Sequence, residues 1–347
     1  MKDNPNEIQF LNTAKVIGIF LVIYAHLSIP QTPYIFINSF HMPLFFCISG
    51  YFVSTSKYTF KDFFIRKFRT LIVPYFIFAI VSLFFELLIG QKYGNNANTH
   101  PDISKYIAGI FLAIPSRAYL GFNIPLWFLP ALFSIEIIFY LYRKYFHRYS
   151  WITVICSFLI GILLKHTLPF RLPWGIDVAL FAMPFVQIGY YLKRKNLNDA
   201  FFIRMNFTAK SSIILTSAIL TLLFSTVNIR HNSGVLVYAL QFNNYFLFFA
   251  AACTGIIFTF MLSSCIPASG LVRFYGRNTI ILLGLHFMAY SVVKGLLHFI
   301  FQIPMEIING NAYLKLFISV GDFIVLTPVI YCVNKYTPQL LGRKKAV

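Results

Sequence analysis

Ten apolar stretches recur along the chain, and short polar segments separate them. Each stretch approaches the length of about 20 residues that an α-helix needs to cross the hydrocarbon core of a membrane. The stretches cover residues 11–29, 35–54, 70–90, 125–142, 151–166, 175–192, 211–228, 243–263, 278–300 and 313–334. The pattern predicts an all-α polytopic membrane protein with about ten transmembrane helices.

One further segment, residues 103–116, is apolar but shorter than a typical transmembrane helix. We predict that it lies at the interface or re-enters the membrane. No internal repeat and no stretch typical of a soluble domain stands out. We therefore expect residues 1–347 to form one integral membrane domain.

The composition supports membrane insertion. Hydrophobic residues make up 58% of the chain and charged residues only 11%, whereas soluble domains carry about 25% charged residues. The formal net charge of +19 raises the alternative of nucleic-acid binding. The basic residues occur in short clusters between apolar runs, which is typical of membrane topology, so we expect no nucleic-acid partner.

The distribution of Lys and Arg predicts the orientation. With a cytoplasmic N-terminus, most Lys and Arg residues between spans fall on the inner side. The outer loops then hold only Lys92, Lys105, Arg117, Arg171 and Arg230. This asymmetry follows the positive-inside rule, and it predicts a multi-pass protein of the cytoplasmic (inner) membrane with both termini in the cytoplasm.

Ionisable residues inside the predicted spans are candidates for function. The first span contains Lys15 near its inner end and His26 near its outer end. They are eleven residues apart, or about 16 Å and three turns of helix, so they share a face. Taken singly, Lys15 also fits a snorkelling interfacial lysine, and His26 a hydrogen-bonded packing residue.

His41 begins the second span, one short turn after His26, and we expect the two imidazoles to lie close together. Imidazole can take and return a proton near neutral pH, which suits a general base that acts on a hydroxyl. A metal site is an alternative, but the outer loops supply no convincing further ligands, so we expect no bound metal.

The loop after the second span is basic and runs into the third span. Arg66 and Arg69 are three residues apart and are predicted to share a helical face that binds phosphate. Anchoring to lipid headgroups is the simpler interpretation. Trp127, at the outer start of the fourth span, fits an interfacial aromatic residue, and His286 in the ninth span is a third intramembrane histidine.

The remaining acidic residues in spans are expected to pair with cations. Glu136 and Asp177 need buried partners that the sequence does not name. Lys315 and Asp322 of the last span are about two turns apart and are predicted to form a structural pair.

Five blocks resemble the acyltransferase-3 family of membrane acyltransferases, in particular its fucose 4-O-acetylase-like subgroup. The first helix resembles the family's motif of a basic residue, ten residues and a histidine, here from Lys15 to His26. The other blocks are SFHMPLFFCISGYF at 39–52, FIRKFRTLIVPYF at 64–76, LWFLPALF at 126–133 and YGRNTIILLGLHF at 275–287. Together they cover most of the chain. Many members carry Arg where this chain has Lys15, and often Asp where it has Asn12.

The resemblance implies transfer of an acyl group, usually acetyl, from cytoplasmic acyl-CoA to a hydroxyl of a cell-surface or lipid-linked glycan. Acetyl-CoA is then a donor substrate, and no permanently bound cofactor is expected. Membrane lipids surround the protein. His26 and His41 are the expected catalytic residues, and Lys15, Arg66 and Arg69 the expected acyl-CoA ligands. Candidate pocket residues are Asn12, Trp127, Asn278 and His286.

Three other functions compete with this interpretation. A transporter or flippase for a lipid-linked saccharide explains the helices and the intramembrane charges, but it does not explain the cation and imidazole on one helix. A non-catalytic partner in a polysaccharide assembly complex would not need Lys15, His26 and Arg69 together. A membrane acyltransferase with a His/Asn pair would lack the His-Met-Pro block at 41–43.

Overall fold

The computed structural model describes residues 8–91, 102–229, 234–267 and 269–343. These residues are almost entirely helical, and apart from one isolated β-bridge between Leu236 and Gln241 they contain no strand. The contacts divide the chain into two compact units. The first unit comprises Met1–Phe52, Phe185–Val237 and Gln241–Thr279, and the second comprises Val53–Pro184, Tyr238–Leu240 and Ile280–Val347.

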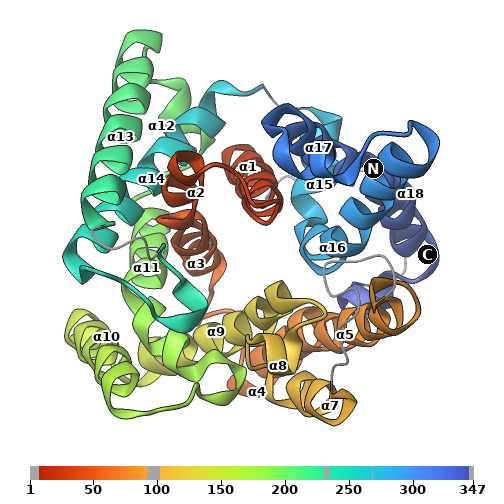
Figure 1. Cartoon of the computed structure of the whole chain (residues 1–347). Coiled ribbons are helices and arrows are strands. Elements are labelled where there is room, and N and C mark those ends of the chain that lie inside the picture. The colour runs from red at the N-terminus through yellow and green to blue at the C-terminus, as the bar shows by residue number, and fades with distance from the viewer. Residues whose placement is uncertain (1–7, 92–101, 230–233, 268, 344–347) are drawn as a thin grey trace. The chain divides into compact units, whose positions relative to one another are not determined.

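The first unit is built around the N-terminal helix. Its helices are α1 (Gln9–Ala25), α2 (Gln31–Asn38), α3 (His41–Phe52), the second half of α11 (Ile176–Arg194), α12 (Asp199–Ile203), α13 (Phe207–Asn228), α14 (Tyr245–Cys265) and α15 (Gly270–Arg277). Helix α1 packs against α14, α15, α3 and α2, and α13 lies alongside α14 (Figure 1).

Two glycines let α3 and α11 approach each other closely. A methyl group on Gly50 would overlap with the backbone of Val186, and one on Gly189 would overlap with the carbonyl oxygen of Cys47. Small residues at such crossings allow membrane helices to pack backbone against backbone. The crossing fixes α3, which begins with His41, within the first unit.

The second unit contains the remaining helices. They are α4 (Phe60–Lys67), η1 (Phe68–Ile72), α5 (Val73–Phe85), η2 (Glu86–Gly90), α7 (Ile103–Leu112), α8 (Arg117–Leu120), η3 (Ile124–Trp127), α9 (Phe128–Tyr145), η4 (His147–Tyr149), α10 (Ser150–Thr167), η5 (Pro173–Gly175), the first half of α11, α16 (Thr279–Gly295), η7 (Leu296–Ile300), α17 (Met305–Gly310), α18 (Ala312–Tyr336) and η8 (Pro338–Leu341). The short turn η6 (Val237–Ala239) begins in the first unit and ends in the second. Of these, η1, η2 and η7 are π-helical turns that extend or precede longer α-helices.

The prediction of an all-α multi-pass membrane protein is confirmed. Within the described residues, nine helical segments are long and apolar enough to cross a membrane. They match the second to tenth predicted spans. The first predicted span corresponds to α1, whose 17 residues lie at the short end of the range for spanning helices.

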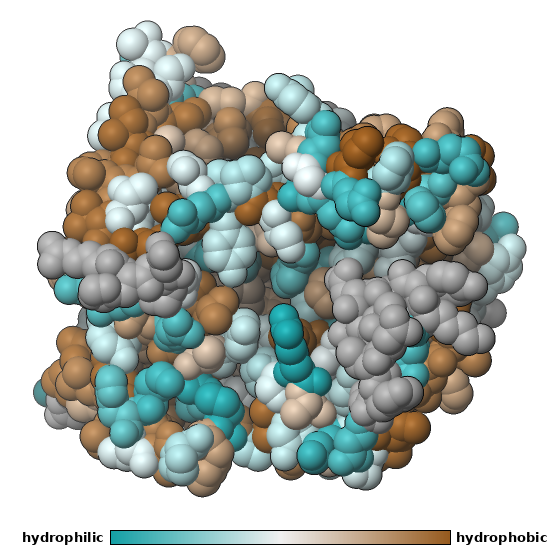
Figure 2. Space-filling model, viewed as in Figure 1, coloured by the Kyte–Doolittle hydropathy of each residue, from teal (hydrophilic) through white to brown (hydrophobic). Residues whose placement is uncertain are grey.

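The surface of several helices is apolar, as lipid contact requires. In α10, Ile152, Leu159 and Leu163 are 60%, 56% and 59% exposed, and in α13 Leu215 is 63% exposed. Figure 2 shows hydrophobic residues over the surfaces of both helices.

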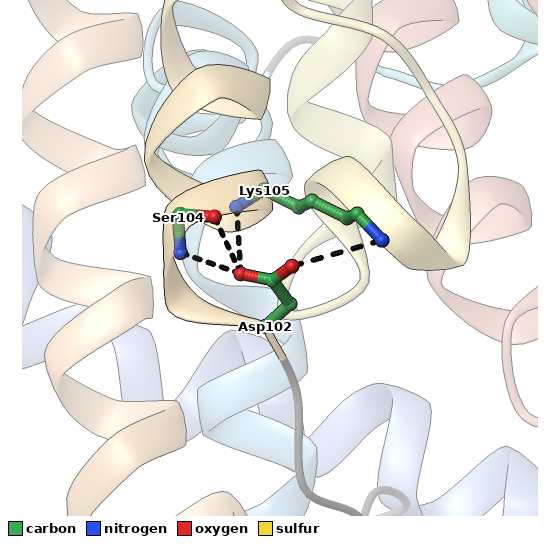
Figure 3. A network of polar contacts seen from close by, with 3 residues as sticks. All are labelled: Asp102, Ser104 and Lys105. Carbon is green, nitrogen blue, oxygen red and sulfur yellow. Dashed lines mark hydrogen bonds and ion pairs between the residues drawn. The ribbon is translucent and has the colours of Figure 1, made fainter.

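The short segment predicted at 103–116 is helix α7, with ten residues. Asp102 caps its N-terminus: one carboxylate oxygen accepts hydrogen bonds from the Ser104 amide (3.0 Å), the Ser104 hydroxyl (2.5 Å) and the Lys105 amide (3.4 Å) (Figure 3). These bonds lower the pKa of Asp102, the Ser104 hydroxyl contributing most. A ten-residue helix spans only about 15 Å, so α7 is too short to cross a bilayer.

The orientation stays a prediction. Of the basic residues on which it depends, five lie outside the described residues, namely Lys2, Lys92, Arg230, Lys344 and Lys345. The contacts divide the chain into two compact units, and the expectation that residues 1–347 form one membrane domain stays a prediction.

Candidate active site

Helix α1 carries the basic residue and leads directly to the first histidine. Lys15 is half-buried, and its ammonium lies 5.6 Å from the centroid of the Phe52 ring at the end of α3. This cation–π contact favours a charged lysine in an apolar setting. His26 is the C-terminal cap of α1, and Lys15 lies in the N-terminal half of the same helix.

His26 and His41 are held in the same way. The Nδ1 atom of His26 lies 2.7 Å from the carbonyl oxygen of Val22, and that of His41 lies 2.8 Å from the carbonyl oxygen of Ile37. A carbonyl can only accept, so each neutral ring carries its proton on Nδ1 and a lone pair on Nε2.

The two imidazoles interact electrostatically but differ in solvent exposure. They interact with each other although helix α2 separates them in the sequence. The His26 side chain is exposed, whereas His41 is 6% exposed. With Nδ1 held by a backbone hydrogen bond, Nε2 is the atom of the His26 ring suited to take a proton from a bound hydroxyl group. Among the described residues, no group of three or more His, Cys, Asp or Glu side chains is arranged to hold a metal ion.

Two candidate pocket residues lie where α1 meets α15. Asn12 is 4% exposed, and a methyl group on Gly276 would lie 2.9 Å from the Asn12 carbonyl oxygen. Asn278, which is 1% exposed, ends α15 and donates from its amide to the carbonyl oxygen of Phe274 at 2.7 Å. Both therefore belong to the first unit, near the N-terminal half of α1.

The structure also brings Asp199 to the start of α1, which the sequence analysis missed. Its carboxylate accepts hydrogen bonds from the backbone amides of Gln9 and Phe10, each at 2.9 Å. The first amides of a helix lack partners within the helix and favour a negative charge. Asp199 is 190 residues from Gln9, so no local capping pattern could reveal it.

The predicted acyl-CoA ligands Arg66 and Arg69 lie in the second unit. Both are exposed, and the Arg66 guanidinium donates to the Tyr58 hydroxyl at 2.7 Å and lies 5.2 Å from the centre of that ring. Arg66 belongs to α4, but Arg69 belongs to the π-helical turn η1. Pro74 favours the π-helical turn, because it cannot donate to a carbonyl one turn earlier and its ring needs space there. That Arg66 and Arg69 share a face that binds phosphate stays a prediction.

Trp127 and His286 are also in the second unit, and both are buried. Trp127 is 5% exposed and its ring centre lies 6.2 Å from that of Tyr238. His286 is fully buried and its Nδ1 lies 2.8 Å from the Leu283 carbonyl oxygen.

Asn123 connects the helices that carry these two residues, and the sequence analysis did not single it out. The fully buried Asn123 amide donates to the Gly284 carbonyl at 2.8 Å and to the Ser82 hydroxyl at 2.9 Å. It thereby joins the start of η3 to α16 and α5. In the sequence, the position of Asn123 directly before the Pro-containing segment 124–127 was the feature that could have drawn attention to it.

The structure shows the ion-pair partners of Glu136 and Asp177. Lys67 pairs with Glu136 at 2.6 Å, and Arg171 pairs with Asp177 at 2.7 Å. The Arg171 guanidinium also donates to the Ala239 carbonyl oxygen at 3.2 Å.

The predicted pair of Lys315 and Asp322 is wrong for the described part of the chain. Neither carboxylate oxygen of Asp322 has a hydrogen-bond partner there, and Asp322 interacts electrostatically with Lys294 instead. Residues seven apart are separated by about 10.5 Å along a helix, which is too far for a direct contact.

Residues 8–333 match the family model of the acyltransferase domain called acyltransferase-3. The chain belongs to the acyltransferase-3 family. No curated protein and no solved structure matches the chain. The expected family is confirmed, and the protein is a membrane acyltransferase with an acyl donor, an acyl acceptor and membrane lipids as its partners.

Membership in the acyltransferase-3 family also decides between the function classes left open by the sequence. A transporter or a non-catalytic assembly partner is no longer needed to explain the intramembrane charges. The match extends over helices of both units, from the residue before α1 to the last turns of α18.

Proposed function

We propose that this acyltransferase moves an acetyl group from acetyl-CoA to a hydroxyl of a cell-surface or lipid-linked glycan. We place it in the fucose 4-O-acetylase-like subgroup and in the cytoplasmic membrane. The blocks at 39–52 and 275–287 support the subgroup, and the positive-inside pattern supports the membrane. Acetyl-CoA is a substrate of this reaction and not a resident cofactor.

One observation carries the proposal. His26 presents an Nε2 lone pair at the end of α1, with its ring fixed through Nδ1, and the cationic Lys15 lies on the same helix. A base and a cation about 16 Å apart fit a substrate whose reactive thioester is separated from its phosphates by a long arm. Lys15 is the proposed phosphate ligand of the first unit.

The proposed reaction is a proton-coupled acyl transfer. His26 Nε2 takes the proton of the acceptor hydroxyl while its oxygen attacks the thioester carbonyl carbon. The carbon–sulfur bond then breaks, and the CoA sulfur leaves as a thiolate that recovers the proton from Nε2. His41, which interacts with His26, orients the ring or the acceptor.

An acyl-enzyme route differs in one step. There, His26 Nε2 itself attacks the thioester, CoA leaves, and the hydroxyl attacks the acetylated ring. Incubation of the protein with acetyl-CoA alone, followed by acid quenching and mass spectrometry, distinguishes the routes: an acetylated His26 peptide indicates the acyl-enzyme, and unmodified peptide indicates direct transfer.

The roles of Arg66 and Arg69 as phosphate ligands remain sequence-based and are proposed separately. Both side chains are exposed and basic on the predicted cytoplasmic side. Replacing Arg69 with Gln is expected to raise the KM for acetyl-CoA while changing kcat less, because the lost contact binds donor in the ground state as well as in the transition state.

The test begins with deletion of the gene in its host and analysis of surface glycans by proton NMR and mass spectrometry. Complementation uses the wild type, H26N and the control H166N, at matched membrane levels. His166 is an exposed histidine of α10. Loss of O-acetyl signals that the wild type and H166N restore, but H26N does not, supports the proposal. Full acetylation with H26N, or accumulation of an unmodified lipid-linked saccharide with unchanged acetylation, contradicts it.

A further inference from the structure

A second polar site lies within the second unit. A cavity of about 460 Å³ is formed by the end of α5, η2, α16, η7 and α17. Its polar lining includes Lys294, His298 and Asn309, and its apolar lining includes Ile89, Val292 and Phe299. On the predicted topology, these helix ends face the outer side of the membrane.

The polar wall of this cavity presents hydrogen-bond donors. The Lys294 ammonium donates to the Asn309 side-chain oxygen at 3.0 Å, which leaves its other N–H groups and the Asn309 amide nitrogen for a ligand. His298 donates from Nδ1 to the Ile303 carbonyl oxygen at 3.0 Å and keeps its ring against the cavity.

Lys294 has charged neighbours on α18. Lys294 interacts electrostatically with both Lys315 and Asp322. Lys315 is 7% exposed and Asp322 is fully buried, and no ion pair to Asp322 occurs within the described residues. Lys294 is therefore a cationic side chain on the wall of a cavity within an apolar helix bundle. Ionisable side chains are costly in a membrane, which makes this wall a candidate for ligand binding.

The other wall of the cavity is apolar and open to lipid. Ile89, Val292 and Phe299 are 45%, 45% and 60% exposed, and they belong to helices that are apolar enough to span the membrane. A ligand that satisfies both walls therefore has an anionic end and a hydrocarbon chain.

We propose that this cavity binds the phosphate headgroup of a membrane lipid, with its chain along the apolar wall. Ammonium and amide groups are good donors to phosphate oxygens, and basic pockets between membrane helices bind anionic headgroups. The phosphate can belong to a phosphoglycerolipid or to a polyprenyl phosphate. The inference concerns a site separate from His26 and does not depend on the identity of the glycan acceptor.

The test is lipid binding by native mass spectrometry of the full-length protein released from detergent. The probes are phosphatidylglycerol, phosphatidylcholine, farnesyl phosphate, farnesol and inorganic phosphate. The variants are K294Q, K294R and N309L, and the matched control is K105Q, which removes an exposed lysine of α7 that does not line the cavity. N309L changes an exposed residue of the cavity wall and provides a readout if K294Q does not fold.

We expect K294Q to weaken binding of the anionic lipids about tenfold, because it removes a charged hydrogen bond to phosphate. K294R and K105Q are expected to retain binding, and N309L to weaken it. Preference for farnesyl phosphate indicates a polyprenyl carrier, and preference for phosphatidylglycerol indicates a bulk lipid. Equal binding by the wild type, K294Q and N309L overturns the proposal, as does binding of inorganic phosphate without retention of either lipid.

Discussion

The ammonium of Lys67 and the carboxylate of Glu136 lie 2.6 Å apart and connect α4 to α9. The Glu136 side chain is 5% exposed and that of Lys67 is 18% exposed. The pair holds the basic helix that contains Arg66 against a long membrane helix.

Removing one partner of this pair is expected to cost more than removing both. K67M leaves a nearly buried carboxylate without its cation and should lower the free energy of unfolding by about 3 kcal/mol. The double variant K67M/E136M should recover much of this loss. Chemical unfolding in detergent micelles measures both.

The ion pair of Lys105 and Asp102 is the natural control for that measurement. Its atoms are 3.6 Å apart and its side chains are 57% and 49% exposed. Since exposed pairs contribute little, K105Q should leave stability almost unchanged. A loss of stability from K105Q as large as that from K67M would contradict the expectation that the buried ion pair contributes more to stability than the exposed one.

The crossing of α3 and α11 predicts a strong effect of adding one methyl group. In G189A the new carbon would overlap with the Cys47 carbonyl oxygen, so the backbones must separate. We expect a loss of about 2 kcal/mol or more and a lower yield of folded protein. G310A is the control, since nothing lies within 4 Å of a methyl group at that position. Equal thermal stability of the two variants would show that the helices do not pack this closely.

Asp199 is expected to stabilise the start of α1. D199A removes the acceptor for the Gln9 and Phe10 amides and should cost about 2 kcal/mol, whereas D199N keeps a neutral acceptor and should cost less. Hydrogen exchange of the first amides of α1 measures the effect locally. Unchanged exchange in D199A would exclude this cap.

The spans could be predicted from the sequence because a membrane helix is selected by its own length and hydropathy. Each of the ten predicted spans has a matching helix, and the short segment at 103–116 is α7. The proximity of His26 and His41 was also predictable, because the two residues are close in the sequence, although the segment between them contains helix α2 and is not the expected short turn. These features depend only on local sequence.

Features that depend on distant contacts could not be predicted. Asp199 reaches α1 from a segment 190 residues away, and the partner of Glu136 is one of many basic residues in the sequence. The π-helical turn at Phe68–Ile72, which contains Arg69 and precedes Pro74, was also not predicted. Lys294 and Asp322 interact across two helices, so the pairing expected within one helix was wrong.

The shared geometry of the two histidines allows their structural and chemical roles to be separated. The amide nitrogen of Asn lies near the position of Nδ1, so H26N and H41N can keep the hydrogen bonds to Val22 and Ile37 while removing Nε2. Both variants should therefore remain folded, with thermal stability close to that of the wild type.

Catalysis should distinguish the two residues. If His26 is the base, H26N lowers kcat for acetyl transfer by about 10²–10⁴. If His41 only orients its neighbour, H41N lowers kcat by about tenfold, and the pH profile still shows the ionisation of His26. Steady-state kinetics with radiolabelled acetyl-CoA over a range of pH measures both effects. A folded H26N protein with wild-type kcat would remove His26 from the chemistry. A larger loss in H41N than in H26N would transfer the role of base to the buried ring, which would require the acceptor hydroxyl to reach a side chain that is only 6% exposed.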